Sequence, residues 1–157
     1  MQSYLNHLSE RIQTITNGTP WFGKSVLEAL EGIDEKMAVK TFHGQHNIAE
    51  LIYHMTQWKR FTFEKAFGDE DFDIGLNSSD DWKAIPSLTL KEWSLMKRDY
   101  FEINEKLIDG LFSIKTEWLS QEVPGRQYDF NELINGIADH DIYHLGQVIY
   151  IYKMIQS

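Results

Sequence analysis

The chain has 157 residues, of which 42% are hydrophobic and 13% aromatic, and its formal net charge is −9. This length and composition predict one globular domain over residues 1–157. The acidic balance argues against nucleic acid and against an anionic membrane surface as partners, because both require a basic face. The chain has no cysteine, which excludes disulfides, thiolate metal ligands and a cysteine nucleophile.

Nothing in the sequence predicts a membrane span or a secretory signal. One of the longest apolar runs is 148–152, far short of the roughly 20 residues that a spanning helix needs. The first seven residues contain neither a basic patch nor an apolar stretch. We therefore expect the cytoplasm as the default compartment.

The first helical region is predicted over residues 4–33, with a break at residues 17–20. Apolar residues recur at helical spacing on both sides of the break. They are Leu5, Leu8, Ile12 and Ile15 before it and Val26, Leu27, Leu30 and Ile33 after it. Thr19 is the expected N-cap of the second part, with Pro20 at the first helical position.

Residues 18–25 match the phosphate-binding pattern G-x-x-x-x-G-K-S letter for letter. That loop follows a buried strand and binds phosphate through its backbone N–H groups. Here an amphipathic helical pattern precedes it, and Pro20 removes one backbone donor. We therefore expect a helix kink whose Trp21 and Phe22 pack in the core, and not a nucleotide site.

Three further helices are predicted by their N-terminal capping pairs, a capping residue followed by Glu three positions later. The pairs are Asn47 with Glu50, Thr89 with Glu92, and Asp129 with Glu132. We expect these helices to end near Gly68, near Gly110 and at the C-terminus, with a turn at Pro124-Gly125 before the last one. The fold class is thus all-α, and the expected architecture is an up-down-up-down four-helix bundle.

A long connection over residues 69–88 joins the second and third predicted helices. It is acidic at its start and then rich in Gly, Asn, Ser and Asp. Structureless connections of this length are uncommon in compact domains and often have a function. Closure over a nearby site is one role for it; an acidic, solvated loop without function is the other.

Three of the six histidines are placed to bind one divalent metal ion. His140 and His144 lie four residues apart on the apolar face of the last helix, so their rings lie one turn apart. His54 lies on the inward face of the helix that begins at Asn47. Bundle cores build metal sites from facing helices, and three protein ligands with open positions are typical of a catalytic site. The alternative is that these histidines are packed and hydrogen-bonded without metal.

Other polar residues carry weaker signals. His43 and His46 flank a short loop and form a rival site or, more simply, a solvated loop; His7 has no evident partner. Asp141 follows His140 directly, but its position is about 100° round the helix, which favours a surface place or a supporting hydrogen bond over base catalysis. Gln147 shares a face with His144 and either orients a ligand or packs in the core.

Three stretches carry a resemblance to a known family. They are residues 20–25, residues 47–58 and residues 136–147, the last containing His-Asp-x-Tyr-His-x-Gly-Gln. The chain resembles the DinB-like superfamily of damage-inducible, metal-binding four-helix bundles, which are related to bacillithiol and mycothiol S-transferases. The resemblance implies a homodimer and a nickel or zinc ion on His54, His140 and His144. All-nitrogen ligation also suits iron and copper, and manganese is a further alternative.

The function expected from the site is metal-dependent chemistry on a small molecule. Bound to the ion, a low-molecular-weight thiol would be transferred to an electrophile in a detoxification step, which the resemblance favours. Bound water would instead hydrolyse a small amide. A non-catalytic metal-binding or ligand-binding module and a plain helical interaction protein are the remaining alternatives. No catalytic residue beyond the ligands is assigned.

Overall fold

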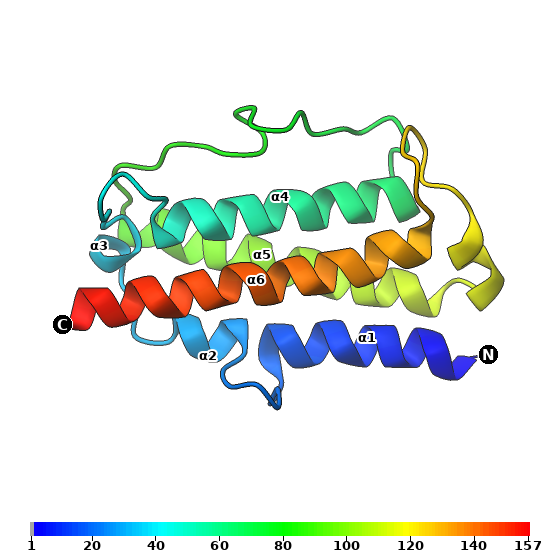
Figure 1. The fold of residues 1–157 in the computed structure, drawn as a ribbon, viewed down its shortest axis with the longest axis horizontal. Coiled ribbons are helices and arrows are strands. Elements are labelled where there is room, and N and C mark those ends of the chain that lie inside the picture. The colour runs from blue at the N-terminus through cyan, green and yellow to red at the C-terminus, as the bar shows by residue number, and fades with distance from the viewer. Residues whose placement is uncertain (1) are drawn as a thin grey trace.

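The structure, a computed structural model, describes residues 2–157 and is all-helical, as the sequence predicts (Figure 1). Its four long helices are α1 (Gln2–Asn17), α4 (Ile48–Phe67), α5 (Leu90–Phe112) and α6 (Phe130–Gln156). Shorter elements are α2 (Val26–Leu30), α3 (Glu35–Ala38) and the 3-10 helix η1 (Thr116–Ser120). None of the described helices has the length and apolar character that crossing a membrane requires.

The starts of α4, α5 and α6 follow the predicted capping pairs. The side chains of Asn47 and Thr89 accept hydrogen bonds from the backbone N–H groups of Glu50 and Glu92, and both glutamates bond back to the cap. Asp129 caps α6 by accepting from the N–H of Glu132. These caps satisfy N–H groups that lack a partner inside the helix. Because the pairs are local, the sequence is enough to locate them.

The connection between α4 and α5 runs back along α4. The side-chain amide of Asn47 donates to the Ile85 carbonyl at 2.9 Å, and the Ile85 N–H donates to Glu50 at 3.0 Å. At the other end, Gly110 of α5 lies against Phe67 of α4. In Figure 1, α4 and α5 accordingly run in the same direction, and α1 and α6 run the opposite way. The expected alternation of direction is therefore wrong, because the long connection is a crossover that makes these two neighbouring helices parallel.

The first helical region differs from the prediction. Helix α1 ends at Asn17, and α2 begins after Ser25, whose side chain forms a capping box with Glu28. The expected helix start at residues 19 and 20 is thus wrong, because Ser25 offers the complete cap. Trp21 is fully exposed and Phe22 is 47% exposed, so these rings do not pack in the core. The turn projects away from the helices (Figure 1).

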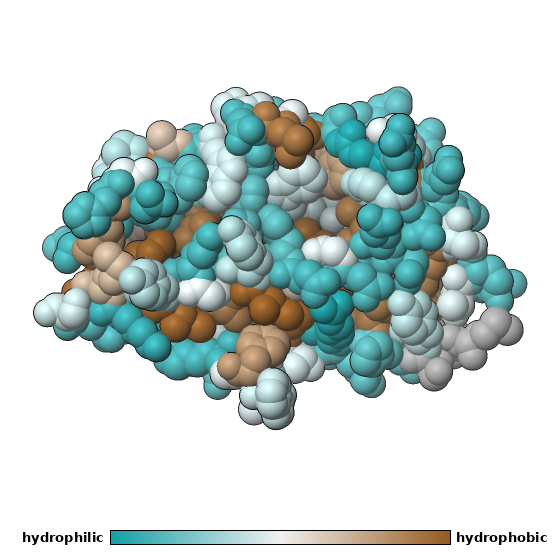
Figure 2. All heavy atoms as spheres, viewed as in Figure 1, coloured by the Kyte–Doolittle hydropathy of each residue, from teal (hydrophilic) through white to brown (hydrophobic). Residues whose placement is uncertain are grey.

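The buried apolar residues form two clusters along the long helices. One lies around α1, η1 and the first half of α6, and the other lies around α2, the first half of α4 and the second half of α6. Between them, buried polar residues occupy the facing parts of α4, α5 and α6. They include His54, Lys59, Asn104, Asp141 and His144. On the face drawn in Figure 2, hydrophilic residues cover most of the surface and hydrophobic ones show between them.

Candidate metal centre

Two facing helices bring the three predicted ligands together. His54 comes from α4, and His140 and His144 come from successive turns of α6. The Nε2 atom of His140 lies 3.0 Å from that of His54 and 3.1 Å from that of His144. His54 and His144 are buried, and His140 is partly buried. Among the described residues, these three form a group whose ligand atoms all lie within 4.8 Å of one another.

Asp81, from the long connection, orients the ring of His54. The Nδ1 atom of His54 lies 2.8 Å from a carboxylate oxygen of Asp81 and 3.2 Å from its backbone carbonyl. Both oxygens only accept, so Nδ1 carries the proton and the Nε2 lone pair points at the other histidines. Asp81 also accepts hydrogen bonds from the Trp58 indole at 2.9 Å and from the Asn77 N–H at 2.7 Å. The carboxylate is therefore held in place, as partners of metal-binding histidines usually are.

Gln147 plays the same part for His144. Its side-chain carbonyl lies 2.8 Å from Nδ1 of His144, which fixes the proton there and leaves the Nε2 lone pair bare. The Nδ1 atom of His140 is buried and has no hydrogen-bond partner among the described residues. The unprotonated Nε2 atoms of His54 and His144 thus both face Nε2 of His140, which has at most one proton to donate.

A metal ion would complete this arrangement. Two nitrogens that each lie about 2.1 Å from one zinc ion are separated by about 3 to 3.4 Å, depending on the bond angle. The observed separations of 3.0 and 3.1 Å fit this range. The donor set, its spacing and the missing proton therefore fit a cation that accepts three lone pairs.

Burial keeps the imidazoles neutral. Burial is the largest of the causes that together lower the pKa of His140 to about 3, followed by the neighbouring charges of His144, His54 and Lys59 in that order. Burial is also the main cause that lowers the pKa of His54 and of His144. Near pH 7 all three rings are therefore in the deprotonated state that metal ligation requires.

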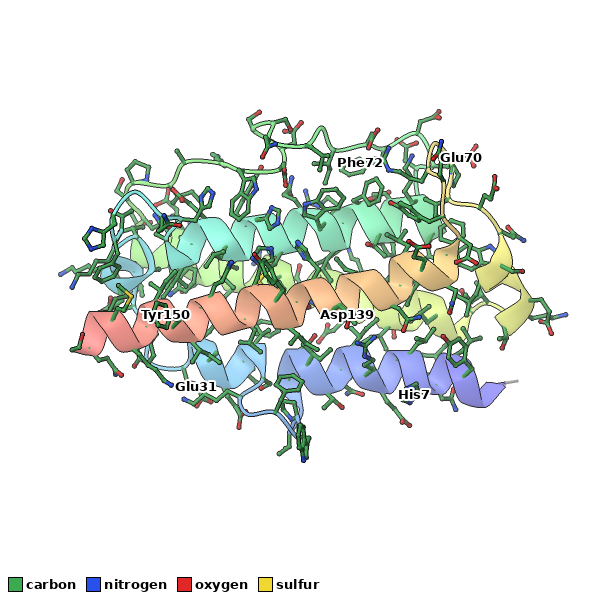
Figure 3. The ribbon with its side chains drawn as sticks, viewed as in Figure 1. His7, Glu31, Glu70, Phe72, Asp139 and Tyr150 are labelled. Carbon is green, nitrogen blue, oxygen red and sulfur yellow. The ribbon has the colours of Figure 1, made fainter. Side chains whose placement is uncertain are left out.

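A cavity of about 590 Å³ adjoins the three rings. Trp82, from the long connection, stacks on His54 with ring centroids 3.8 Å apart, and His46 stacks on Trp82 at 3.8 Å. Trp58 and Tyr143 also line the cavity. In Figure 3, Glu70 and Phe72 mark where the connection leaves the end of α4 before it passes over this region. The connection thus supplies a wall of the site and an orienting carboxylate.

Within the described part of the chain, the other histidines do not form a rival site. His46 Nδ1 lies 2.9 Å from a carboxylate oxygen of Glu50, and the residue lies at the edge of the cavity. His43 is exposed and has a left-handed backbone, with φ of 50°. His7 is exposed on α1 (Figure 3) and does not belong to the group formed by the three predicted ligands.

Asp141 lies in the interior, so its expected surface position is wrong, and its contacts are with Tyr100 and Lys59 instead of with the three histidines that the expected hydrogen bond would support. It accepts from the Tyr100 hydroxyl at 2.8 Å and lies 2.8 Å from Lys59 Nζ. Sequence reasoning missed Lys59, although its position four residues after Met55 on the inward face of α4 was a usable signal. It also missed Asp81 and Trp82, whose sequence context looks like any other turn.

Comparisons with known proteins do not identify the chain. No protein-family model matches it, and the searches of curated proteins and of solved structures return no significant match. The resemblance to the DinB-like superfamily therefore remains an expectation based on the three sequence stretches.

Proposed function

We propose that the protein binds one divalent transition metal ion on His54, His140 and His144 and uses it to transfer a low-molecular-weight thiol to an electrophile. The observation that supports this most directly is the convergence of three Nε2 atoms with too few protons to pair with one another. Nickel or zinc is proposed, since neutral nitrogen ligands suit both. The proposal includes a DinB-like four-helix bundle with one long crossover.

The environment of the three histidines favours an open site over a purely structural one. Structural zinc is almost always held by four protein ligands, whereas catalytic zinc keeps a position for water or substrate. Here three histidines border a cavity of about 590 Å³. A divalent ion in such a site supplies Lewis acidity, which lowers the pKa of a thiol or a water molecule.

The scarcity of carboxylates in this cavity favours thiol transfer over amide hydrolysis. Among the residues that line it, Asp81 is the one carboxylate, and it already accepts from His54, Trp58 and Asn77. A hydrolase of this kind commonly uses a carboxylate as general base for water. A thiol is far more acidic than water and needs less help to lose its proton. Hydrolysis remains the second candidate, supported by the same open metal site.

Elemental analysis of the purified, reconstituted protein tests the metal centre. We expect about one equivalent of metal in the wild type and its loss in His54→Ala, His140→Ala and His144→Ala. His46→Ala is the matched control, because His46 lies at the same cavity without joining the group, and it should keep the metal. A wild type that binds no metal after reconstitution would refute the proposal.

The reaction is tested on the metal-loaded protein. Free thiol is followed with a colorimetric reagent while small thiols are paired with small electrophiles, and release of amine from small amides is followed in parallel. Metal-dependent loss of thiol that is absent in His140→Ala supports transfer. Metal-dependent amide cleavage without thiol consumption would support the hydrolase instead.

A further inference from the structure

Two glycines inside α6 have no evident structural reason to be glycine. Gly136 and Gly146 lie within the helix, where glycine is the weakest helix former after proline. Neither has a positive φ, and a Cβ atom at either position would meet no atom within 4 Å. At Gly110 of α5, in contrast, a Cβ would come within 2.5 Å of the Phe67 ring, so close packing requires glycine there. The two glycines of α6 instead leave space open.

Each of these glycines lines a cavity beside the histidines. Gly136 borders a cavity of about 230 Å³ that shares Trp58 and His140 with the cavity of the metal centre. Gly146 borders one of about 550 Å³ that shares three residues with it. They are His46, Tyr143 and Gln147. The candidate metal centre therefore has a cavity on either side along α6.

The smaller cavity has the size and walls of an aromatic-ring site. Most of its lining is aromatic or aliphatic, and the polar exceptions besides His140 are Thr62 and Glu132. The apolar side chains are those of Trp58, Tyr128, Leu133 and Ile137. An apolar cavity of about 150 Å³ is known to accept benzene. A volume of about 230 Å³ therefore has room for a substituted aromatic ring.

Trp58 makes this cavity rigid where it meets the metal centre. Its indole N–H is bonded to Asp81 at 2.9 Å, and its ring meets that of His140 edge-on, with centroids 6.3 Å apart. A ring held in this way is a fixed wall, which lowers the conformational cost of binding a flat ligand. Aromatic walls also favour offset or edge-on contacts with another ring.

We infer that the cavity beside Gly136 binds the aromatic ring of a small ligand whose polar end reaches His54, His140 and His144. This rests on the proposed metal centre and specifies its substrate class as an aromatic compound with a polar reactive group next to the ring. The cavity beside Gly146, which also contains His43, Gln45 and Gln147, is left for a more polar second compound.

Two hydroxamates that differ only by the ring test this inference. Both acetohydroxamate and benzohydroxamate bind metals through the same group, and each is titrated into cobalt-loaded protein while the visible spectrum is recorded. We expect the wild type to bind benzohydroxamate at least about tenfold more tightly, because only its ring reaches the apolar cavity. In Gly136→Leu, whose new side chain enters the cavity, the affinity for benzohydroxamate should fall at least about tenfold.

Gly146→Leu is the matched control. It makes the same substitution on the same helix but in the other cavity, so the preference for benzohydroxamate should persist. Both changes replace glycine by a strong helix former, and neither meets an obstructing atom at Cβ, so both variants should fold. The response to acetohydroxamate reports whether the metal is in place in each variant.

The outcomes separate the inference from the proposed function. Equal affinity of the wild type for the two hydroxamates overturns the ring site while leaving the metal centre standing. Loss of the preference in both glycine variants, or in neither, also overturns it. A protein that develops no cobalt spectrum and no response to acetohydroxamate overturns the metal centre and the ring site together.

Discussion

His140 and Asp141 are neighbours in α6 but belong to two different polar clusters. His140 joins His54 and His144 next to a cavity, and Asp141 joins Lys59 and Tyr100 in the fully enclosed interior. One residue turns the side chain about 100° round the helix, which is enough to send the two to different sides. Helices α4 and α6 therefore contribute to both clusters, one open to a cavity and one closed.

The two clusters differ in how their polar groups are satisfied. The closed one contains its own counterion, since Lys59 Nζ lies 2.8 Å from Asp141 Oδ2 at 0% exposure of both residues. The pair lacks an aligned hydrogen bond, and Asp141 Oδ1 has no partner among the described residues. Burial raises the pKa of Tyr100 well above its ordinary value, so its hydroxyl stays a neutral donor to Asp141. The open cluster has lone pairs and the Asp81 carboxylate but no cation of its own, which is why it suits an added cation.

The largest expected effect comes from breaking the closed cluster. Asp141→Ala leaves the Lys59 ammonium buried without a counterion, and should lower the free energy of unfolding by about 3–5 kcal/mol. The measurement is urea denaturation of the metal-free protein. Asp139→Ala is the control, because its ion pair with Arg11 is largely exposed and should contribute at most about 1 kcal/mol.

The double variant Lys59→Met/Asp141→Leu sharpens this test. Replacing a buried ion pair by apolar residues of similar size is often neutral or stabilising, so most of the lost stability should return. If Asp141→Ala costs no more than Asp139→Ala, the closed cluster does not have the structural role that we assign to it.

The second effect is a stabilisation that depends on the open cluster alone. Metal at about 1,000 times its dissociation constant should raise the free energy of unfolding by about 4 kcal/mol, because it binds the folded state. Thermal unfolding with and without metal measures this increment. It should vanish in His54→Ala and persist in Lys59→Met/Asp141→Leu. Loss of the increment in both would show that the clusters act as one unit.

A smaller effect is expected from the carboxylate that orients His54. Asp81→Asn keeps the shape of the side chain but removes its charge, and should weaken metal affinity by about 10–100-fold. Competition with a chromogenic chelator measures the affinity. Asp80→Asn removes the same charge from an exposed neighbouring residue and should change the metal affinity little. Equal losses in the two variants would assign the effect to general electrostatics.

The helices and the histidines could be predicted because their signals are local. Capping pairs three residues apart locate the starts of α4, α5 and α6, and the spacing of His140 and His144 puts them on one face. His54 follows from the apolar periodicity of its own helix. No long-range information is needed for any of these.

The features that sequence reasoning missed depend on packing between distant segments. Asp81 and Trp82 reach the site because their connection runs back along α4, and nothing near them in sequence indicates that path. The same crossover makes α4 and α5 parallel. Trp21 is exposed although aromatic, since the turn that carries it projects from the fold. Lys59 and Asp141 are each unusual at an inward position, but their pairing is visible only once the helices are in register.

The last expected effect is a dependence of stability on pH that comes from the open cluster. Burial lowers the pKa of His140 to about 3 in the folded protein, against about 6.5 in the unfolded chain. Between these values the unfolded state binds the proton first, so the metal-free protein loses stability as the pH falls from about 6.5 towards 3. His140→Leu should show a shallower loss of stability over this range in urea denaturation, whereas His7→Leu, an exposed position, should follow the wild type.

Taking the difference between variant and wild type cancels the opposite contribution of Asp141, whose pKa burial raises. Identical pH profiles for His140→Leu and the wild type would mean that His140 is not held neutral by its surroundings, and the open cluster would then lack the property that distinguishes it from the closed one.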